Sequence, residues 1–197
     1  MIQRRHVFTL LASACALPQA ALAAPTRYAL DHENSHVEFK FKLNGAPQTG
    51  SMPIERAKIT IDPQHLPASQ VDVTLNVARA RTGLIFITQA MTSSGVLDAA
   101  QFPTIRFVSR RIILGAAGRI SEGAKIIGDL TLHGVTKPII LQAAIYRPHG
   151  TPADDLSQLN VVLNGDLNRN DFGASGFPNL VGNQVTLDIR ARITAVK

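Results

Sequence analysis

The stretch GDLTLHGVTKPIIL, residues 128–141, contains the pattern that decides the fold of this 197-residue chain. In its first half, Leu130 and Leu132 fall on one side of an extended chain, and Thr131 and His133 fall on the other. Alternation with a period of two is typical of a β-strand that has one apolar face and one wet face. The stretch therefore predicts a strand that is buried on one side only.

The same stretch contains its own turn. Gly134 gives the backbone the freedom that a tight turn needs, and Pro138 favours an extended conformation at Lys137, where a second strand begins. His133 lies at the edge of this turn, on the polar side. We interpret it as a structural side chain that bonds to turn backbone or to water. A role as a catalytic base or metal ligand is the alternative.

The other histidines give little support for a metal site. His32 and His36 share one side of the chain, but about 13 Å would separate them on an extended strand, and DHENSHVEF continues into a strand pattern. A site assembled by folding stays open. The chain lacks a G-x-S-x-G elbow, and the glycine-rich residues 173–182 lack the Gly-Lys-Ser/Thr ending of a phosphate loop. We therefore predict no catalytic residues, no metal ligands and no cofactor.

Alternation of the same kind recurs along the chain and predicts an all-β protein. Turn-rich segments such as DPQHLP, PHGTPADD and FGASGFPN separate the alternating stretches. One helical segment is expected near Ile87–Ala100. The eight predicted strands are residues 36–43, 57–62, 71–78, 104–109, 125–132, 138–146, 159–167 and 185–193.

Eight such strands fit either a two-layered sandwich or a closed antiparallel barrel, because both bury one face of each strand. The apolar faces include small residues among the large ones, which favours a barrel with an internal cavity, since facing sheets of a sandwich normally fill such gaps. The small residues are Ala57, Gly128, Ala143, Gly165 and Ala191.

The first 23 residues have the features of an export signal. Arg4 and Arg5 precede an apolar segment that ends in Ala21-Leu22-Ala23, a small-residue cleavage site. We expect residues 1–23 to be a signal peptide, residues 24–197 to form one mature domain, and the protein to be periplasmic. The arginine pair is compatible with the twin-arginine route and with the Sec route. The apolar segment is too short to span a membrane.

The composition excludes several function classes. The single cysteine lies in the expected signal peptide, so the mature domain has no disulfide, thiolate metal site or cysteine nucleophile. Loss of Arg4 and Arg5 with the signal lowers the formal net charge from +6 to +4. The excess charge is dispersed, tryptophan is absent and there are two tyrosines, so nucleic acid is not an expected partner.

Four segments occur in an order that resembles a known family. They are YALDHENSHVEFKFKLNG (28–45), VLDAAQFPTIRFVS (96–109), GDLTLHGVTKPIIL (128–141) and NRNDFGASGFPNLVGNQVTLDI (168–189). They cover nearly all of the expected mature domain, and they resemble the YceI-like family of exported lipocalin-like proteins. The LTLHGVTKP and FPTIRF pieces are the most specific. One departure is Asn44, which stands before Gly45 where family members often have a histidine.

The resemblance implies an extended eight-stranded antiparallel lipocalin-like barrel with one short helical segment. It also implies non-enzymatic binding, transport or storage of a long-chain amphiphile inside the barrel, with a polyisoprenoid, an isoprenoid quinone or a fatty-acid derivative as the ligand. A homodimer is possible. Two alternatives stay open, a periplasmic enzyme that acts on a lipid and a structural or stress-response scaffold with a solid core.

The apolar strand faces supply the candidate ligand-binding residues. Phe86 and its neighbour Ile87 are expected at the mouth, and Arg79, Arg81 or Asn170 could meet a ligand head group. Ordinary core packing is the alternative for each apolar residue. The candidates are Phe39, Phe41, Leu75, Val77, Phe86, Phe107, Leu130, Leu132, Ile139 and Leu141.

Overall fold

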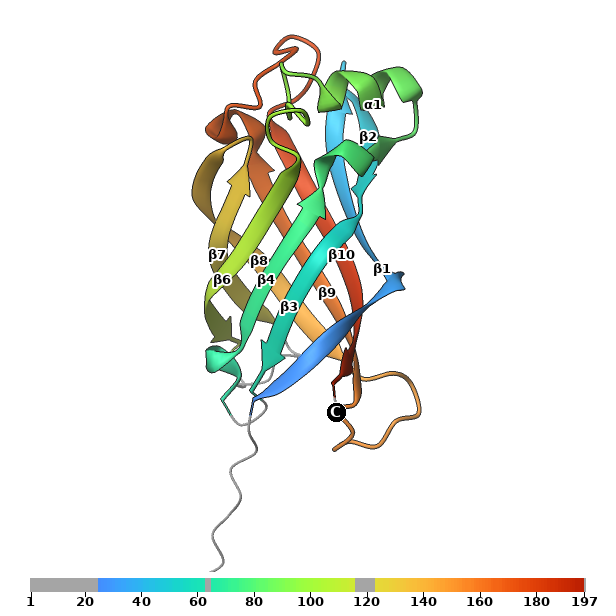
Figure 1. The fold of residues 1–197 in the computed structure, drawn as a ribbon, viewed down its shortest axis with the longest axis vertical. Helices are drawn as coiled ribbons and strands as arrows, with labels where there is room; N and C mark the ends of the chain where they lie inside the picture. Colours follow the sequence, from blue (N-terminus) through green and yellow to red (C-terminus); the bar gives the residue numbers. More distant parts are fainter. Residues whose placement is uncertain (1–24, 63–64, 116–122, 197) are drawn as a thin grey trace, which may run out of the picture.

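The computed structural model describes residues 25–62, 65–115 and 123–196, which form an elongated β-barrel (Figure 1). The expected signal peptide lies outside the described residues. None of the described helices is long and apolar enough to cross a membrane. The strands are β1 (Thr26–Leu43), β2 (Ala46–Met52), β3 (Ile54–Ile61), β4 (Gln70–Asn76), β5 (Arg81–Thr82), β6 (Thr104–Leu114), β7 (Ala124–Leu132), β8 (Val135–Tyr146), β9 (Gln158–Asn168) and β10 (Gln184–Ala195).

Eight of these strands form a closed antiparallel wall. The sheet runs in the order β10-β9-β8-β7-β6-β4-β3-β1, and β10 pairs again with β1 to close it. Beyond Pro53, β2 continues the path of β3 and pairs with the second half of β1, and the short β5 pairs with β2. The closed wall confirms the predicted barrel and excludes the sandwich. Each of the eight predicted strands lies mainly within one wall strand.

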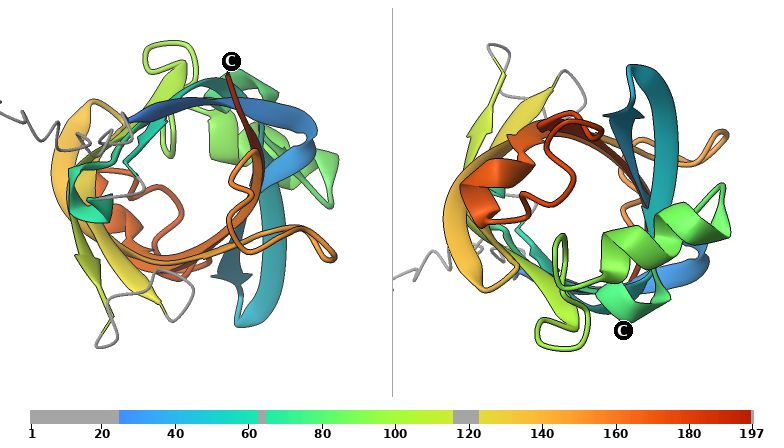
Figure 2. Two further views of the ribbon diagram at one scale, coloured as in Figure 1. Left: turned by 90° about the horizontal axis from the view of Figure 1, so that it is seen from below. Right: turned by 90° about the horizontal axis from the view of Figure 1, so that it is seen from above.

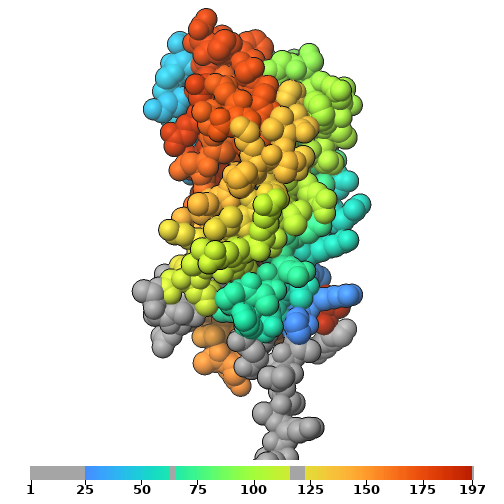
Figure 3. Space-filling view, turned by 90° about the vertical axis from the view of Figure 1, so that its left-hand side faces the viewer, coloured from blue at the N-terminus to red at the C-terminus, as the bar shows by residue number. Residues whose placement is uncertain are grey.

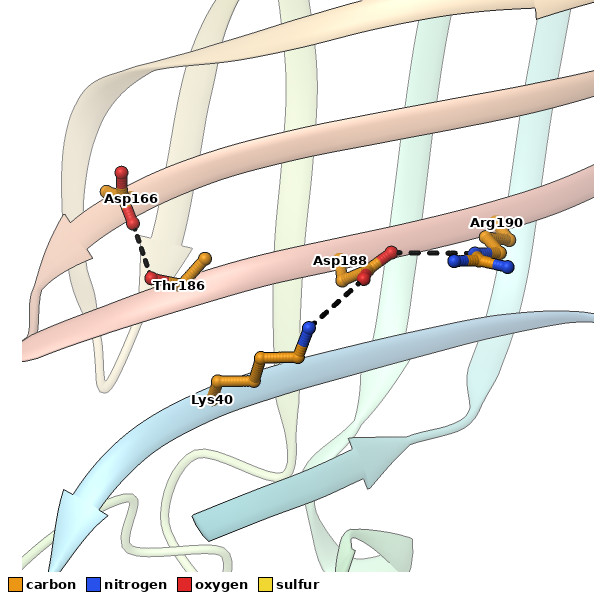
Figure 4. Close-up of polar contacts among 5 residues, drawn as sticks. All are labelled: Lys40, Asp166, Thr186, Asp188 and Arg190. Atoms are coloured by element: carbon orange, nitrogen blue, oxygen red, sulfur yellow. Dashed lines mark hydrogen bonds and ion pairs between the residues drawn. The ribbon is translucent and has the colours of Figure 1, made fainter. Parts of the chain in front are cut away.

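The seam between β1 and β10 has one apolar and one polar face. Phe39 pairs with Leu187, whereas Lys40 and Arg190 approach the carboxylate of Asp188 from outside, at 3.3 Å and 3.7 Å. Figure 4 shows these contacts across the outer surface. Since exposed ion pairs contribute little free energy, this polar row keeps the outer face wet while backbone pairing and the apolar inner face hold the seam.

Strand β7 shows how the alternation becomes a barrel wall. Every second residue from Ala124 to Leu132 is buried, and the residues between them are partly or fully exposed. Outside, the Thr131 hydroxyl lies 2.8 Å from that of Thr136 on β8. The side of the molecule that carries β6, β7 and β8 is a continuous surface of side chains (Figure 3). The period-two pattern therefore separates an apolar interior from a wet exterior, as predicted.

The inward glycines make room for neighbouring rings rather than for empty space. A Cβ atom at Gly128 would lie 2.5 Å from the Phe107 ring and 2.5 Å from the Val108 carbonyl oxygen. At Gly165, a Cβ would lie 2.7 Å from the Leu141 side chain. The prediction that small residues leave a cavity is thus wrong for these two glycines, because large side chains from adjacent strands lie over them.

The turn between β7 and β8 has the predicted position and an unusual first residue. His133 and Gly134 have φ angles of 50° and 74°, and Leu132 pairs with Val135, as in a two-residue hairpin. The His133 Nδ1 lies 3.3 Å from the Phe172 carbonyl oxygen, so Nδ1 carries the donated proton. The imidazole also packs edge-on against the Phe102 ring, with the centroids 4.9 Å apart. His133 is therefore a structural residue that ties this turn to two loops.

The helical segment begins earlier and ends earlier than predicted. Helix α1 spans Ile85–Thr92, and Ser93 ends it with an extended backbone. The residues after it form turns, in which the Val96 and Asp98 amides donate to the Ser93 carbonyl. Serine and glycine favour such local bonding over helix continuation. Short 3-10 helices complete the described elements: η1 (Leu66–Ala68), η2 (Val77–Arg79) and η4 (Arg169–Phe172).

Arg169, which is 4% exposed, organises the long loop between β9 and β10. Its Nη1 donates to the carbonyls of Ala174 and Gly176, at 2.5 Å and 2.8 Å, while its Nε and Nη2 donate to those of Gly182 and Val181. Within the described part of the chain, no carboxylate pairs with this guanidinium. Burial lowers the pKa of the Arg169 guanidinium, yet an arginine keeps its proton in proteins. The side chain therefore holds both arms of the loop from within.

Two substitutions at His133 separate the contribution of its ring contacts from that of its left-handed backbone. We expect His133→Ala to lower the free energy of unfolding by about 1–3 kcal/mol, because it removes the contacts of the ring and because alanine adopts the left-handed backbone at φ 50° less readily than histidine does. His133→Asn should lose less, since asparagine tolerates this conformation. Urea unfolding measures both, and equal losses would contradict the role of the backbone angle.

Replacement of Arg169 tests the loop. Lysine carries one compact ammonium and cannot reach four carbonyls in different directions. Arg169→Lys should therefore cost about 1–3 kcal/mol of stability and speed hydrogen exchange of the amides at 173–183. Arg190→Lys is the matched control, because Arg190 is exposed and its change should stay within about 0.5 kcal/mol. Unaltered exchange in Arg169→Lys would contradict this account.

Candidate functional site

The barrel encloses an apolar cavity of about 600 Å³. Its lining extends from Leu66 and Ile145, at the end of the barrel where β1 begins and β10 ends, to Phe86 and Phe177 at the other end. A twelve-residue strand such as β8 rises about 40 Å, and the usual tilt of barrel strands leaves an axial height of roughly 30 Å. A volume of about 600 Å³ spread over this height makes the cavity much longer than it is wide.

Nine of the ten predicted binding residues line this cavity. They come from six different elements, because the inner faces of the wall strands meet around one axis. The nine residues are Phe39, Phe41, Leu75, Phe86, Phe107, Leu130, Leu132, Ile139 and Leu141. Contact with a ligand stays a prediction for each of them, but the structure brings all nine to the wall of one cavity.

Val77, the tenth, does not line the cavity. Strand β4 ends at Asn76, whose side-chain oxygen accepts a hydrogen bond from the Arg79 amide and starts η2. Val77 is consequently turned into a core cluster with Met52, and only 1% of its surface is exposed. The alternation in the sequence continues through Val77, so a prediction from periodicity placed it on the strand face that Leu75 occupies.

One end of the cavity is closed by side chains. Tyr28, Ile61, Leu159 and Ile193 form a buried cluster there, against which Leu66 and Leu156 pack from two loops. The Tyr28 hydroxyl donates to the Leu156 carbonyl oxygen at 2.8 Å, and burial raises the pKa of this phenol. This hydrogen bond ties the loop between β8 and β9 to strand β1. The packed side chains at this end therefore form a floor for the cavity.

The opposite end is a mouth. Helix α1 lies on one side of it and the loop between β9 and β10 lies on the other (Figure 2, right). Phe86 on α1 and Phe177 and Leu180 in the loop line the cavity and are also largely exposed to solvent. Ile87, expected beside Phe86, is buried and lines the cavity too. The apolar interior thus continues to the outside at this end.

Few polar residues border the cavity. Of the described residues that line it, Asn44, Ser69 and Arg169 are polar. Near the floor, the Ser69 hydroxyl accepts a hydrogen bond from the backbone N–H of Asp62 at 3.0 Å. Asn44 lies in the β1–β2 turn, and its backbone N–H donates to the carbonyl oxygen of Leu180. Arg169 uses four of its five donors on backbone carbonyls of the loop, which leaves one N–H that makes no bond to these carbonyls. Any polar recognition is therefore concentrated at the mouth.

The three residues that we expected to meet a ligand head group lie outside the cavity. Arg79, Arg81 and Asn170 are exposed and do not line the cavity. The residue of this segment that borders the cavity is Arg169, whereas the sequence had suggested its neighbour Asn170 as a contact for the head group. No signal in the sequence distinguishes the two, because burial of an arginine depends on the carbonyls that the loop presents only after folding.

His32 and His36, in the middle of β1, belong to no metal-binding group among the described residues. Residues 32–36 read His-Glu-Asn-Ser-His, a spacing that binds zinc only when a helix brings both histidines to one face. Here the stretch belongs to β1, and the register with β10 shifts between Asp31 and His36. Among residues 25–62, 65–115 and 123–196, no group of three or more His, Cys, Asp or Glu side chains could hold a metal.

Comparisons with known proteins agree with this architecture. A UPF0312 protein of Pseudomonas savastanoi pv. phaseolicola is 32% identical over 184 residues, which cover 91% of this chain and 92% of the relative. BcnA of Burkholderia cenocepacia has a similar structure, with a TM-score of 0.72 and 16% identity, over 83% of this chain and 99% of that one.

A polyisoprenoid-binding domain from Saccharophagus degradans also has this fold, with a TM-score of 0.63 and 15% identity over 87% of this chain and 99% of the domain. At such low identity, the two solved structures support the fold alone. The family model of the YceI-like domain matches residues 28–193, which include every wall strand in whole or in large part. The chain therefore belongs to the YceI-like domain family, as the segments around LTLHGVTKP predicted.

Proposed function

We propose that this protein binds one long-chain amphiphile inside the barrel, without chemical conversion, and carries or stores it. The observation that supports this most directly is the long cavity lined by apolar side chains, open at the mouth and closed at the floor. The proposed ligand is a polyisoprenoid, an isoprenoid quinone or a fatty-acid derivative. Its tail would lie along the axis and its polar end would lie near Arg169 and Asn44.

The free energy of tail burial is sufficient for binding. Each buried CH₂ group gains about 0.8 kcal/mol, so a tail of about twenty such groups gains roughly 16 kcal/mol. Immobilisation costs an estimated 4–15 kcal/mol. A cavity without hydrogen-bonding groups along most of its length can therefore hold a long tail, and it discriminates by length and width rather than by polar contacts.

The relatives support the ligand class without fixing the ligand. The Saccharophagus degradans domain is a polyisoprenoid-binding domain with the same fold. The expected signal peptide at residues 1–23 supports export to the periplasm, where a carrier would keep an oily molecule away from water. The polar described residues of the lining are an asparagine, a serine and an arginine, which favours binding over the enzymatic alternative. The cavity does not fit a scaffold with a solid core.

The native ligand tests the proposal. The mature protein would be purified without detergent from its own cells, extracted with organic solvent, and the extract identified by mass spectrometry. We expect one class of long-chain lipid at close to one molecule per protein. A folded protein that repeatedly yields no lipid, or turnover of an added lipid at a rate that scales with protein concentration, would contradict the proposal.

A charge inside the cavity should displace the ligand. Leu75 faces the interior, and Thr74, its neighbour on β4, faces outward opposite Arg106 and Arg56. We expect Leu75→Glu to lower lipid occupancy at least tenfold, since a carboxylate would be buried against hydrocarbon. Thr74→Glu adds the same charge on the wet face and should keep full occupancy.

A second variant covers the case in which Leu75→Glu does not fold. Ala57 lines the cavity on β3, and Ala57→Phe would fill part of the channel without adding charge. We expect this variant to fold and to select shorter or fewer lipids in the same extraction. An unchanged lipid profile in folded Ala57→Phe would contradict the location of the ligand.

A further inference from the structure

Five large apolar side chains surround the mouth and remain in contact with solvent. We call them the mouth rim, and among them Ile85 is 75% exposed, Phe86 60% and Leu180 51%. Exposed apolar groups are common singly, but several of them around one opening indicate a surface that meets another apolar phase. The mouth rim consists of Leu84, Ile85, Phe86, Phe177 and Leu180.

The mouth rim is divided between the two sides of the opening. Leu84, Ile85 and Phe86 begin helix α1, whereas Phe177 and Leu180 belong to the loop between β9 and β10, across the mouth (Figure 2, right). Leu84 occupies the N-cap position of α1 and its side chain makes no capping bond. Polar residues are normally preferred at this position, so the apolar start of α1 serves something other than the stability of the helix.

The mouth rim is continuous with the cavity. Phe86, Phe177 and Leu180 contribute both to the rim and to the lining. A tail that passes from outside into the barrel would therefore meet apolar side chains along its whole path. This continuity distinguishes the rim from exposed apolar residues on the outer wall, such as Ile140 on β8, which is 50% exposed and does not line the cavity.

The charges near the mouth favour an anionic partner. Arg79 and Arg81 are exposed just before α1, and Lys42 is exposed at the end of β1. Residues 77–97 and 42–50 contain no aspartate or glutamate. Asp171 is an exposed acid in the loop across the mouth. With a formal net charge of +4 for the expected mature domain, once Arg4 and Arg5 are subtracted from the +6 of the whole chain, the apolar rim with basic neighbours matches surfaces that insert at the interface of anionic lipids.

We propose that the mouth rim inserts into the surface of an anionic phospholipid bilayer, so that the mouth opens directly into the membrane interface. The proposal builds on the proposed function, because it gives the tail a route between bilayer and cavity that avoids water. A bilayer is favoured over a second copy of the chain because two facing mouths would bring Lys42, Arg79 and Arg81 toward the same residues of the other copy.

Vesicle flotation tests the proposal with the mature protein. The vesicles would contain phosphatidylcholine alone or phosphatidylcholine with phosphatidylglycerol at about three to one. We expect binding to the anionic vesicles that weakens as salt is raised. Ile85→Ser should lower the bound fraction at least fivefold, and Ile140→Ser, an equally apolar change on the outer wall, should leave it unchanged. Neither residue lines the cavity.

The outcomes separate docking from ligand binding. Lipid-loaded protein that does not float with anionic vesicles would overturn the docking proposal and leave the proposed function intact. Vesicle binding by protein that yields no extracted lipid would contradict the proposed function and leave docking to the membrane intact. Equal loss in Ile85→Ser and Ile140→Ser would also overturn the proposal. So would a dimer in sedimentation that Ile85→Ser converts to a monomer, with no vesicle binding by either form.

Discussion

The pairing between β1 and β10 is the constraint on which the rest of the structure depends. An open sheet of these strands would expose its apolar face or collapse on itself, whereas closure turns that face into an interior. Phe39 and Leu187 meet on the inside of the seam, while Lys40 and Asp188 meet outside it. The cavity, its floor and its mouth all follow from this closure, because each is formed by inner faces that only a complete wall brings together.

The ends of the barrel are built differently, and this asymmetry gives the cavity a direction. At the floor, apolar side chains from two loops pack against Tyr28 and Ile193. At the mouth, the polar interactions are internal to the loop, since Arg169 satisfies carbonyls around itself and leaves apolar side chains outside. In the complex that we propose, the tail of the amphiphile points toward the floor and its polar end toward the mouth.

The period-two pattern predicted the wall, because each wall strand is buried on one face, and it also predicted most of the lining. It failed where local hydrogen bonds override the pattern, as at Val77, where the Asn76 side chain ends β4. Strand β2 was not predicted, since its sequence APQTGSM does not alternate and its inward Gly50 lies under the Phe39 ring. Arg169 could not be assigned from sequence, because the carbonyls that hold it come from residues up to thirteen positions away.

We propose above all that the cavity of this barrel is a binding site for a single long tail. The most direct measurement is a crystal structure of the protein purified without detergent from its own cells. The account predicts continuous density along the barrel axis, from beside Phe86 and Phe177 toward Leu66. An interior in which the lining side chains have closed the space, or in which ordered water fills it, would contradict the claim.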